Sequence, residues 1–251
     1  MKRFKGQQTY LLLLLILSIF SITGCGLLSD KVTFTVPANG ATGFAINEKI
    51  AATFSKEMDP ATITAATFTL KQGATAVPGT IDYAGVTAVF TPDDDLAAST
   101  IYTATITTGV KQLDGDKPLS DYVWSFTTGT TADDTQPTVT LLSPADGSTD
   151  VCINKTLSIT FSEEMNPLTI TDQSFSVIHD ITVSVTGTVT YDSKTNIATF
   201  KPSSDLIAST KYIVVIGPEV KDLAGNALAS NLLWNYVWSF TTGTTTCTET
   251  Q

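Results

Sequence analysis

The sequence has few of the residues on which metal, redox and phosphate chemistry usually depends. Its 251 residues include one histidine, three cysteines and a single arginine, Arg3. Most zinc and haem sites are therefore excluded, because they need clustered imidazole or thiolate ligands. Lysine and arginine total 14 against 24 aspartates and glutamates, which gives a net charge of −10. Such a chain is a poor candidate for binding the phosphate backbone of a nucleic acid.

The N-terminal segment 1–24 is interpreted as a signal peptide. Three basic residues precede an apolar run at 11–20, which is shorter than the roughly 20 residues that a membrane-spanning helix needs. The following Ile22-Thr23-Gly24-Cys25 resembles the bacterial lipobox, which implies lipidation of Cys25 and a tether at 25–30. The absence of an aspartate after Cys25 favours the outer membrane, on its periplasmic or surface-exposed face. The alternative is a cysteine that merely follows an ordinary cleavage site.

The charge left after cleavage also bears on membrane attachment. Removal of residues 1–24 deletes three positive charges, so the mature chain carries 11 − 24 = −13. Such a surface repels anionic lipid headgroups. We therefore expect the lipid at Cys25, rather than the folded part, to hold the protein at the membrane.

The chain contains an internal repeat of domain size. The spacing between matching segments is 107 residues at the start (144 − 37), 110 in the middle (206 − 96) and 114 at the end (236 − 122). This increase indicates short insertions in surface loops of the second copy. The matching segments are 37–42 with 144–149, 52–60 with 159–167, 96–100 with 206–210, 110–115 with 220–225, and 122–130 with 236–244.

Each copy has the strand pattern of a β-sandwich. Short alternating runs are separated by Pro, Gly, Asn and Asp clusters, and the pattern predicts about seven strands per copy, as in immunoglobulin-like sandwiches. Single helical turns are expected at 59–63 and 166–170. The sequence thus predicts an all-β chain with Ig-like domain 1 at 31–130, a linker at 131–136 and Ig-like domain 2 at 137–251. The expected strands are 32–36, 50–54, 67–70, 79–83, 86–90, 101–107 and 122–127, then 139–142, 157–161, 175–178, 183–191, 197–201, 212–216 and 236–240.

These motifs, in this order, resemble the bacterial Ig-like domain of S-layer and other surface proteins. The family pattern continues from Pro-x-Asx-Gly through Thr-Phe-Ser-x-x-Met-Asx-Pro and Val-Lys-Asp-x-x-Gly-Asn to a closing Trp-x-Phe-Thr-Thr-Gly. The first copy departs from it at Gly115-Asp116, a change that a turn tolerates. The resemblance covers 31–243. It implies sandwich modules used in tandem in envelope proteins, often as spacers, and it supplies no catalytic residues.

The repeated Met and Trp residues are expected to belong to the core. Met58 and Met165 precede an Asx-Pro pair whose proline suits the start of a helical turn. Trp124 and Trp238 lie in the last strand of each copy, where alternation places them on one face with the following Phe. Their occurrence in both copies favours packing over ligand binding.

An insertion in the second copy provides candidate ligand contacts. We assign Trp234 and Tyr236 to this insertion, around 231–235, and they are the residues best placed for a specific contact. An exposed aromatic pair there would favour a polysaccharide, ice or another surface polymer as ligand. Burial of the pair would argue against it.

The two remaining cysteines are expected to form a disulfide. An envelope ectodomain lies in an oxidising compartment, where an even pair suggests a bridge. If strand 138–142 pairs in parallel with the last strand, Cys152 and Cys247 lie at the same pole of domain 2. A metal or nucleophilic thiol is the alternative, but it lacks a nearby histidine. His179 is expected to be exposed in a turn.

Acidic clusters raise structural calcium as an alternative to solvated turns. Calcium prefers several carboxylate oxygens from adjacent loops, and Asp133-Asp134 fall in the linker, where an ion could stiffen the two modules. None of the clusters matches an EF-hand loop. We favour solvated turns, and expect no cofactor and no metal.

The sequence contains no enzyme signature, such as a Gly-x-Ser-x-Gly elbow, a phosphate loop or a His-Glu-x-x-His motif. A hydrolase is the weakest alternative, although carboxylate pairs alone do not exclude one. We expect a non-catalytic, lipid-anchored envelope protein that acts as a spacer or interaction scaffold at the cell surface. The main alternative is an adhesin that binds envelope polysaccharide or a surface protein through domain 2. A subunit of a larger assembly, joined through edge strands, is a further possibility.

Overall fold

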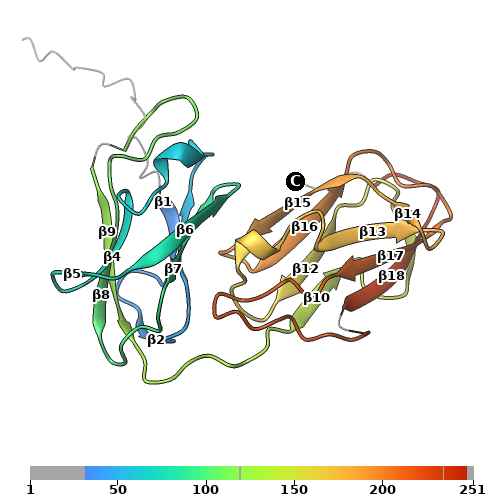
Figure 1. Cartoon of the computed structure of the whole chain (residues 1–251). Helices are drawn as coiled ribbons and strands as arrows, with labels where there is room; N and C mark the ends of the chain where they lie inside the picture. The colour runs from blue at the N-terminus through green and yellow to red at the C-terminus, as the bar shows by residue number, and fades with distance from the viewer. Residues whose placement is uncertain (1–31, 119, 234, 248–251) are drawn as a thin grey trace, which may run out of the picture.

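The computed structural model describes residues 32–118, 120–233 and 235–247. These residues form two β-sandwiches joined by a linker, and Figure 1 shows them beside one another. The predicted all-β tandem of Ig-like domains is confirmed. Within this part of the chain, no helix has the length and apolar character required to cross a membrane.

Domain 1 consists of a four-stranded and a five-stranded sheet. The first has the order β1-β3-β7-β6 and the second β2-β9-β8-β4-β5. Ile50 and the alternate residues after it in β3 point into the sandwich, because successive side chains of a strand face opposite sides. The strands are β1 (Val32–Val36), β2 (Thr42–Phe44), β3 (Ile50–Phe54), β4 (Phe68–Gln72), β5 (Thr75–Ala76), β6 (Gly79–Ala84), β7 (Thr87–Pro92), β8 (Ile101–Ile106) and β9 (Tyr122–Thr128).

Domain 2 repeats this topology strand for strand. Its sheets have the orders β10-β12-β16-β15 and β11-β18-β17-β13-β14. The predicted strand 183–191 is divided into two strands of different sheets, β14 and β15. The strands are β10 (Val139–Ser143), β11 (Ser148–Val151), β12 (Leu157–Phe161), β13 (Phe175–His179), β14 (Val183–Ser184), β15 (Gly187–Asp192), β16 (Ile197–Pro202), β17 (Lys211–Ile216) and β18 (Tyr236–Thr242).

The first strand of each domain is divided between the two sheets. β1 and β10 end one residue before Pro37 and Pro144, which have no N–H to continue a ladder. The chain then crosses to the other sheet, where β2 pairs in parallel with β9 and β11 with β18. The expectation that strand 138–142 pairs with the last strand is therefore wrong, because β10 pairs antiparallel with β12.

The two helical turns form where the sequence predicts them. They are the 3-10 turns η1 (Pro60–Thr62) and η2 (Pro167–Thr169). The Oδ1 atoms of Asp59 and Asn166 accept hydrogen bonds from the backbone N–H two residues later, at 3.0 and 3.1 Å. The Met-Asx-Pro motif thus specifies a capped turn, with the proline fixing its first φ angle.

The repeated Met and Trp residues lie in the cores, as predicted. Met58 and Met165 are each 1% exposed, and Trp124 and Trp238 are 1% and 2% exposed. Trp124 packs against Phe68 with ring centroids 5.9 Å apart. These tryptophans are therefore unavailable as ligand platforms.

Candidate functional site

Two of the predicted site residues, Cys25 and Trp234, lie outside the described residues. Tyr236 is described, and its assignment to the insertion is wrong. It is the first residue of β18 and packs against Trp238, as Tyr122 of β9 packs against Trp124. It is half-buried, and its role as a ligand contact remains a prediction.

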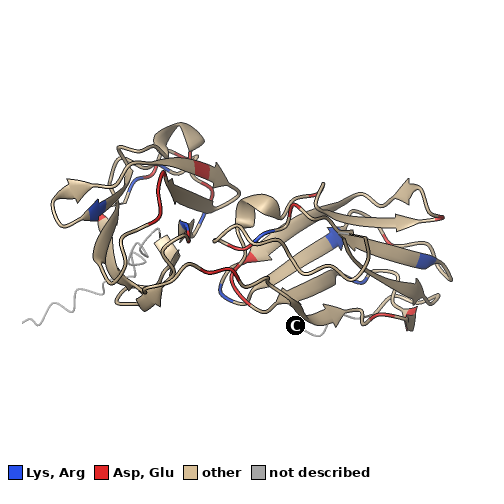
Figure 2. Ribbon diagram, turned by 60° about the horizontal axis from the view of Figure 1, so that its bottom comes forward, with Lys and Arg blue, Asp and Glu red and all other residues tan. Residues whose placement is uncertain are grey.

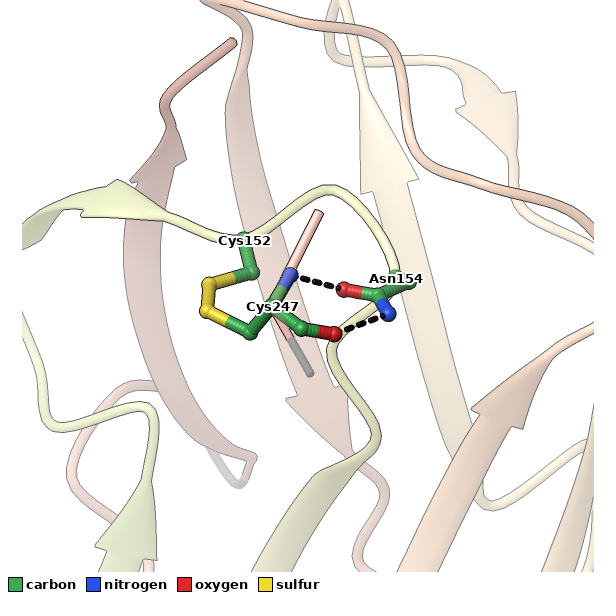
Figure 3. The surroundings of a disulfide bond; sticks show 3 residues. All are labelled: Cys152, Asn154 and Cys247. Atoms are coloured by element: carbon green, nitrogen blue, oxygen red, sulfur yellow. Dashed lines mark hydrogen bonds between the residues drawn. A yellow bond between two sulfur atoms is a disulfide. The ribbon is translucent and has the colours of Figure 1, made fainter. Parts of the chain in front are cut away.

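The disulfide between Cys152 and Cys247 is confirmed. Their Cα atoms are 5.6 Å apart, and the bridge closes a sequence separation of 95 residues. Figure 3 shows that Asn154 reinforces it: Nδ2 donates to the carbonyl oxygen of Cys247 at 2.9 Å, and Oδ1 accepts from its N–H at 3.0 Å. The tail after β18 is thereby fixed to the loop that follows β11.

The linker is held by the same arrangement in domain 1. Asn47, the counterpart of Asn154, donates from Nδ2 to the carbonyl oxygen of Asp133 at 2.9 Å. Its Oδ1 accepts from the N–H of Asp133 at 2.8 Å. The chain is therefore attached to domain 1 well past the last strand, close to the point where domain 2 begins.

A leucine of domain 2 is inserted against domain 1. Leu223 lies in the loop between β17 and β18, is 3% exposed, and belongs to the buried apolar cluster of domain 1. Its carbonyl oxygen accepts a hydrogen bond from the N–H of Lys49 at 3.1 Å. Leu168 of η2 also packs against this cluster. The two domains therefore share a continuous apolar contact.

One outer sheet face belongs to the same apolar cluster as Leu223, and it is apolar only in domain 1. Val36, Ala51 and Val89 form one row across β1, β3 and β7. They are buried although they point away from the sandwich interior, with exposures of 6%, 4% and 0%. The corresponding row in domain 2 is polar and half-buried, and it consists of Ser143, Ser158 and Thr199.

Acidic side chains surround this contact. Figure 2 shows acidic segments where the linker passes between the domains. Burial, followed by the charge of Asp133, raises the pKa of Glu48 to about 7. Burial likewise raises the pKa of Glu164 to about 7 and, with Asp133 and Asp222, raises that of Glu163. The junction thus holds carboxyl groups that are costly to ionise.

Three of these carboxylates lie close enough to share a cation. Oxygen atoms of Asp133, Glu163 and Asp222 lie within 4.8 Å of one another, and such oxygens suit calcium. Asp222 is 2% exposed, but its Oδ1 already accepts hydrogen bonds from the N–H groups of Gly225 and Asn226 at 2.6 and 2.8 Å. Calcium at the linker remains a prediction.

The insertion of domain 2 forms the rim of a shallow surface hollow. Its volume is about 340 Å³, and Ile213, Val237 and Leu232 line it together with Lys211 and Asp146. Asn231 fixes the insertion, because its Oδ1 accepts from the N–H of Val237 at 2.7 Å and its Nδ2 donates to the Val237 carbonyl at 2.8 Å.

The expectation that His179 is exposed in a turn is wrong. It is the last residue of β13 and its side chain is only 13% exposed. The ring packs edge-on against Tyr212 with centroids 5.5 Å apart, and Nδ1 lies 3.1 Å from Oδ2 of Asp180. The histidine is a packing residue, and the turn begins after it.

Comparisons with known proteins agree with this fold. A segment of 83 residues is 40% identical to an S-layer protein of Geobacillus stearothermophilus, covering 33% of this chain and 6% of that protein. The chain therefore spans only a small part of that relative's length.

Two solved structures are similar to this chain at low TM-scores. The N-terminal part of the bacterial S-layer protein SbsC is 14% identical with a TM-score of 0.32, over 83% of this chain and 43% of that one. L,D-transpeptidase 3 from Mycobacterium tuberculosis is 16% identical with a TM-score of 0.28, over 54% and 48%. Neither supports a conclusion about function.

A family model described as bacterial Ig-like domain matches residues 29–128 and again 133–242. The two matches coincide with the two sandwiches and together cover most of the chain. The chain therefore belongs to the bacterial Ig-like domain family and carries two copies of that domain in tandem.

Proposed function

We propose that this protein is a non-catalytic, lipid-anchored protein of the bacterial envelope. In this proposal its two Ig-like domains act as a spacer or interaction scaffold of fixed geometry at the cell surface. The observation that carries it is the docked junction. Leu223 is buried against domain 1 and Asn47 holds the linker, and these contacts favour one fixed arrangement of the two domains. A scaffold needs such a fixed relation between its ends.

The similarity to a segment of an S-layer protein supports an envelope location, and so does the disulfide. Disulfides persist in compartments outside the cytosol. The lipobox-like Ile22-Thr23-Gly24-Cys25 supports attachment by lipid, and a chain this acidic is repelled by anionic lipid headgroups.

Metabolic labelling with an alkyne fatty acid in a bacterial host tests the anchor. The wild-type chain should take up the label and sediment with membranes, whereas Cys25→Ser should lose both properties. The double variant Cys152→Ser/Cys247→Ser is the matched control and should retain the label. Label or membrane attachment that persists in Cys25→Ser contradicts the proposed anchor.

Binding of a surface polysaccharide through domain 2 is the second candidate function. It is supported by the hollow beside the insertion and by Leu232 and Leu233, which are 54% and 82% exposed. In a polysaccharide array, binding that is lost on Trp234→Ala and kept on Leu113→Ala would favour this function. If no polysaccharide binds and the fold is intact, the scaffold remains as the proposed function.

A further inference from the structure

The loop that docks domain 2 onto domain 1 has an undocked counterpart. Leu113 of domain 1 occupies the position of Leu223 in the repeated motif, at the pole where β9 begins. Leu223 is 3% exposed, whereas Leu113 is 64% exposed. The chain therefore has two such leucine-bearing loops, and only the loop of domain 2 is docked.

The backbone donor and acceptor that correspond to the junction hydrogen bond have no partners at the two ends of the molecule. In the junction, the Lys49 N–H donates to the Leu223 carbonyl oxygen at 3.1 Å. The counterpart of Lys49 is Thr156, whose N–H has no hydrogen-bond partner among the described residues. The carbonyl oxygen of Leu113 likewise accepts no hydrogen bond within that part of the chain. The two ends thus carry a matching donor and acceptor.

A buried acceptor at the Leu113 pole is also without a partner. Gln112 stands where domain 2 has Asp222, and it is 6% exposed. Its Oε1 atom has no hydrogen-bond partner among the described residues, whereas the Asp222 carboxylate accepts from Gly225 and Asn226. An unpaired buried acceptor is unfavourable, so the Leu113 loop lacks the internal hydrogen bonds that Asp222 supplies to the Leu223 loop.

Like-charge repulsion between the two open ends is weaker than it is in the existing junction. There, Glu48 of domain 1 faces Glu163, Glu164 and Asp222 of domain 2. At the open ends the corresponding residues are Lys155 on the receiving side and Lys56, Glu57 and Gln112 on the inserting side. A contact between copies therefore replaces a group of carboxylates by groups of both signs.

We propose that copies of the protein associate end to end. The Leu113 pole of one copy inserts against the outer face of the β10-β12-β16-β15 sheet in domain 2 of a second copy. Leu141, which is 64% exposed, supplies apolar area on that face beside Thr160. Since the two contacting surfaces differ, the association is head to tail and can extend beyond a dimer into chains.

This contact is weaker than the junction inside one chain. The receiving row is polar, and Ala61 stands where Leu168 packs in the junction. The junction also benefits from its linker, which gives the partner domain a millimolar effective concentration. Without that linker, association in solution is expected only as the protein concentration approaches about 1 mM.

On an anchored protein, such chains would run along the membrane. β1 begins at the same pole as Leu113, because Val32 pairs with Phe54, and the nearby Met58 forms a bridge with Gln112. The seven residues from Cys25 to Val32 reach at most about 25 Å at 3.6 Å per residue. A neighbour can therefore reach the Leu113 pole only by lying beside the lipid surface.

Sedimentation equilibrium on residues 26–251, which include every described residue, tests the proposal. The weight-average mass of the wild type should rise with concentration past that of a dimer. Leu113→Asp should remain monomeric, while Leu232→Asp, an exposed leucine elsewhere, should associate like the wild type. A wild type that is monomeric up to about 1 mM, or equal association of Leu113→Asp, would overturn the proposal.

A mixing experiment tests both surfaces together. Leu113→Asp keeps the receiving face, and Ser158→Arg keeps the inserting leucine, so neither variant should associate alone. Their mixture should form dimers and stop there. Larger species from the mixture, or no dimers in a mixture whose components both melt like the wild type, would contradict the proposed pairing.

Discussion

Asn47 holds the backbone of Asp133 through two hydrogen bonds, one donated by Nδ2 at 2.9 Å and one accepted by Oδ1 at 2.8 Å. Asn154 makes the same pair with Cys247. Asn47 and Asn154 are counterparts in the repeat. The same pair of hydrogen bonds therefore holds the linker in domain 1 and the tail in domain 2. The linker is therefore part of folded domain 1 and not a free hinge.

Asn47→Ala should release the linker. Each lost hydrogen bond contributes about 0.5–1.5 kcal/mol, so amide exchange at Asp133 should become roughly 10 to 100 times faster, measured by hydrogen exchange. Asn154→Ala is the matched control and should leave the Asp133 amide unchanged. Equal exchange in the wild type and Asn47→Ala would show that the clamp does not hold the linker.

Leu223→Ala should destabilise domain 1, although the substitution lies in domain 2. Removal of a buried leucine side chain costs about 2–5 kcal/mol, and a site at a domain surface relaxes more readily, so about 2 kcal/mol is expected. Leu113→Ala should change the unfolding free energy by less than about 0.5 kcal/mol, as surface substitutions do. Denaturant unfolding measures both, and equal effects would contradict the docked role of Leu223.

Removal of the disulfide should destabilise domain 2 directly and domain 1 only through the loss of the docked Leu223. In the loop-entropy model a closed loop of about 100 residues contributes up to about 4.7 kcal/mol. Calorimetry of Cys152→Ser/Cys247→Ser should therefore lower the domain 2 transition most, while the domain 1 transition falls by no more than it does in Leu223→Ala. A larger fall of the domain 1 transition would contradict a bridge that acts within domain 2.

The pH dependence of the junction follows from its carboxyl groups. Burial raises the pKa of Glu48 and Glu164 from 4.5 to about 7, so the folded state binds more protons than the unfolded chain between these values. The free energy of unfolding is therefore highest below pH 4.5, falls as the pH rises to 7, and loses no more from these groups above that. The loss should be about 1–2 kcal/mol per group after allowance for partial solvent contact.

Glu48→Gln and Glu164→Gln should flatten this profile, measured as unfolding free energy from pH 4 to pH 8. Glu57→Gln replaces the exposed counterpart of Glu164 in domain 1 and should leave the profile unchanged. Parallel profiles for the wild type and Glu48→Gln would show that this carboxyl group titrates normally.

The repeat and its alternation predicted the architecture because both are local properties of the sequence. The strands, the capped turns and the buried Trp124 and Trp238 all follow from side-chain period and turn chemistry. The split of the first strand was missed. Pro37 and Pro144 mark it in the sequence, but which sheet the chain joins after a proline depends on contacts with β9 and β18.

The junction could not be derived from the sequence, because it depends on contacts between residues far apart in the chain. One signal was nevertheless present. The row Val36, Ala51 and Val89 is apolar where its counterpart Ser143, Ser158 and Thr199 is polar. A comparison of the two copies, position by position, would have indicated that within one chain only domain 1 has this face covered.

Small-angle X-ray scattering of residues 26–251 tests the central claim, a scaffold of fixed geometry, most directly. At concentrations well below those of association, a single arrangement of the two domains should fit the wild-type curve at low and high salt. Leu223→Asp, which places a charge in the apolar contact, should require a mixture of orientations. A wild type that also requires such a mixture would contradict the account.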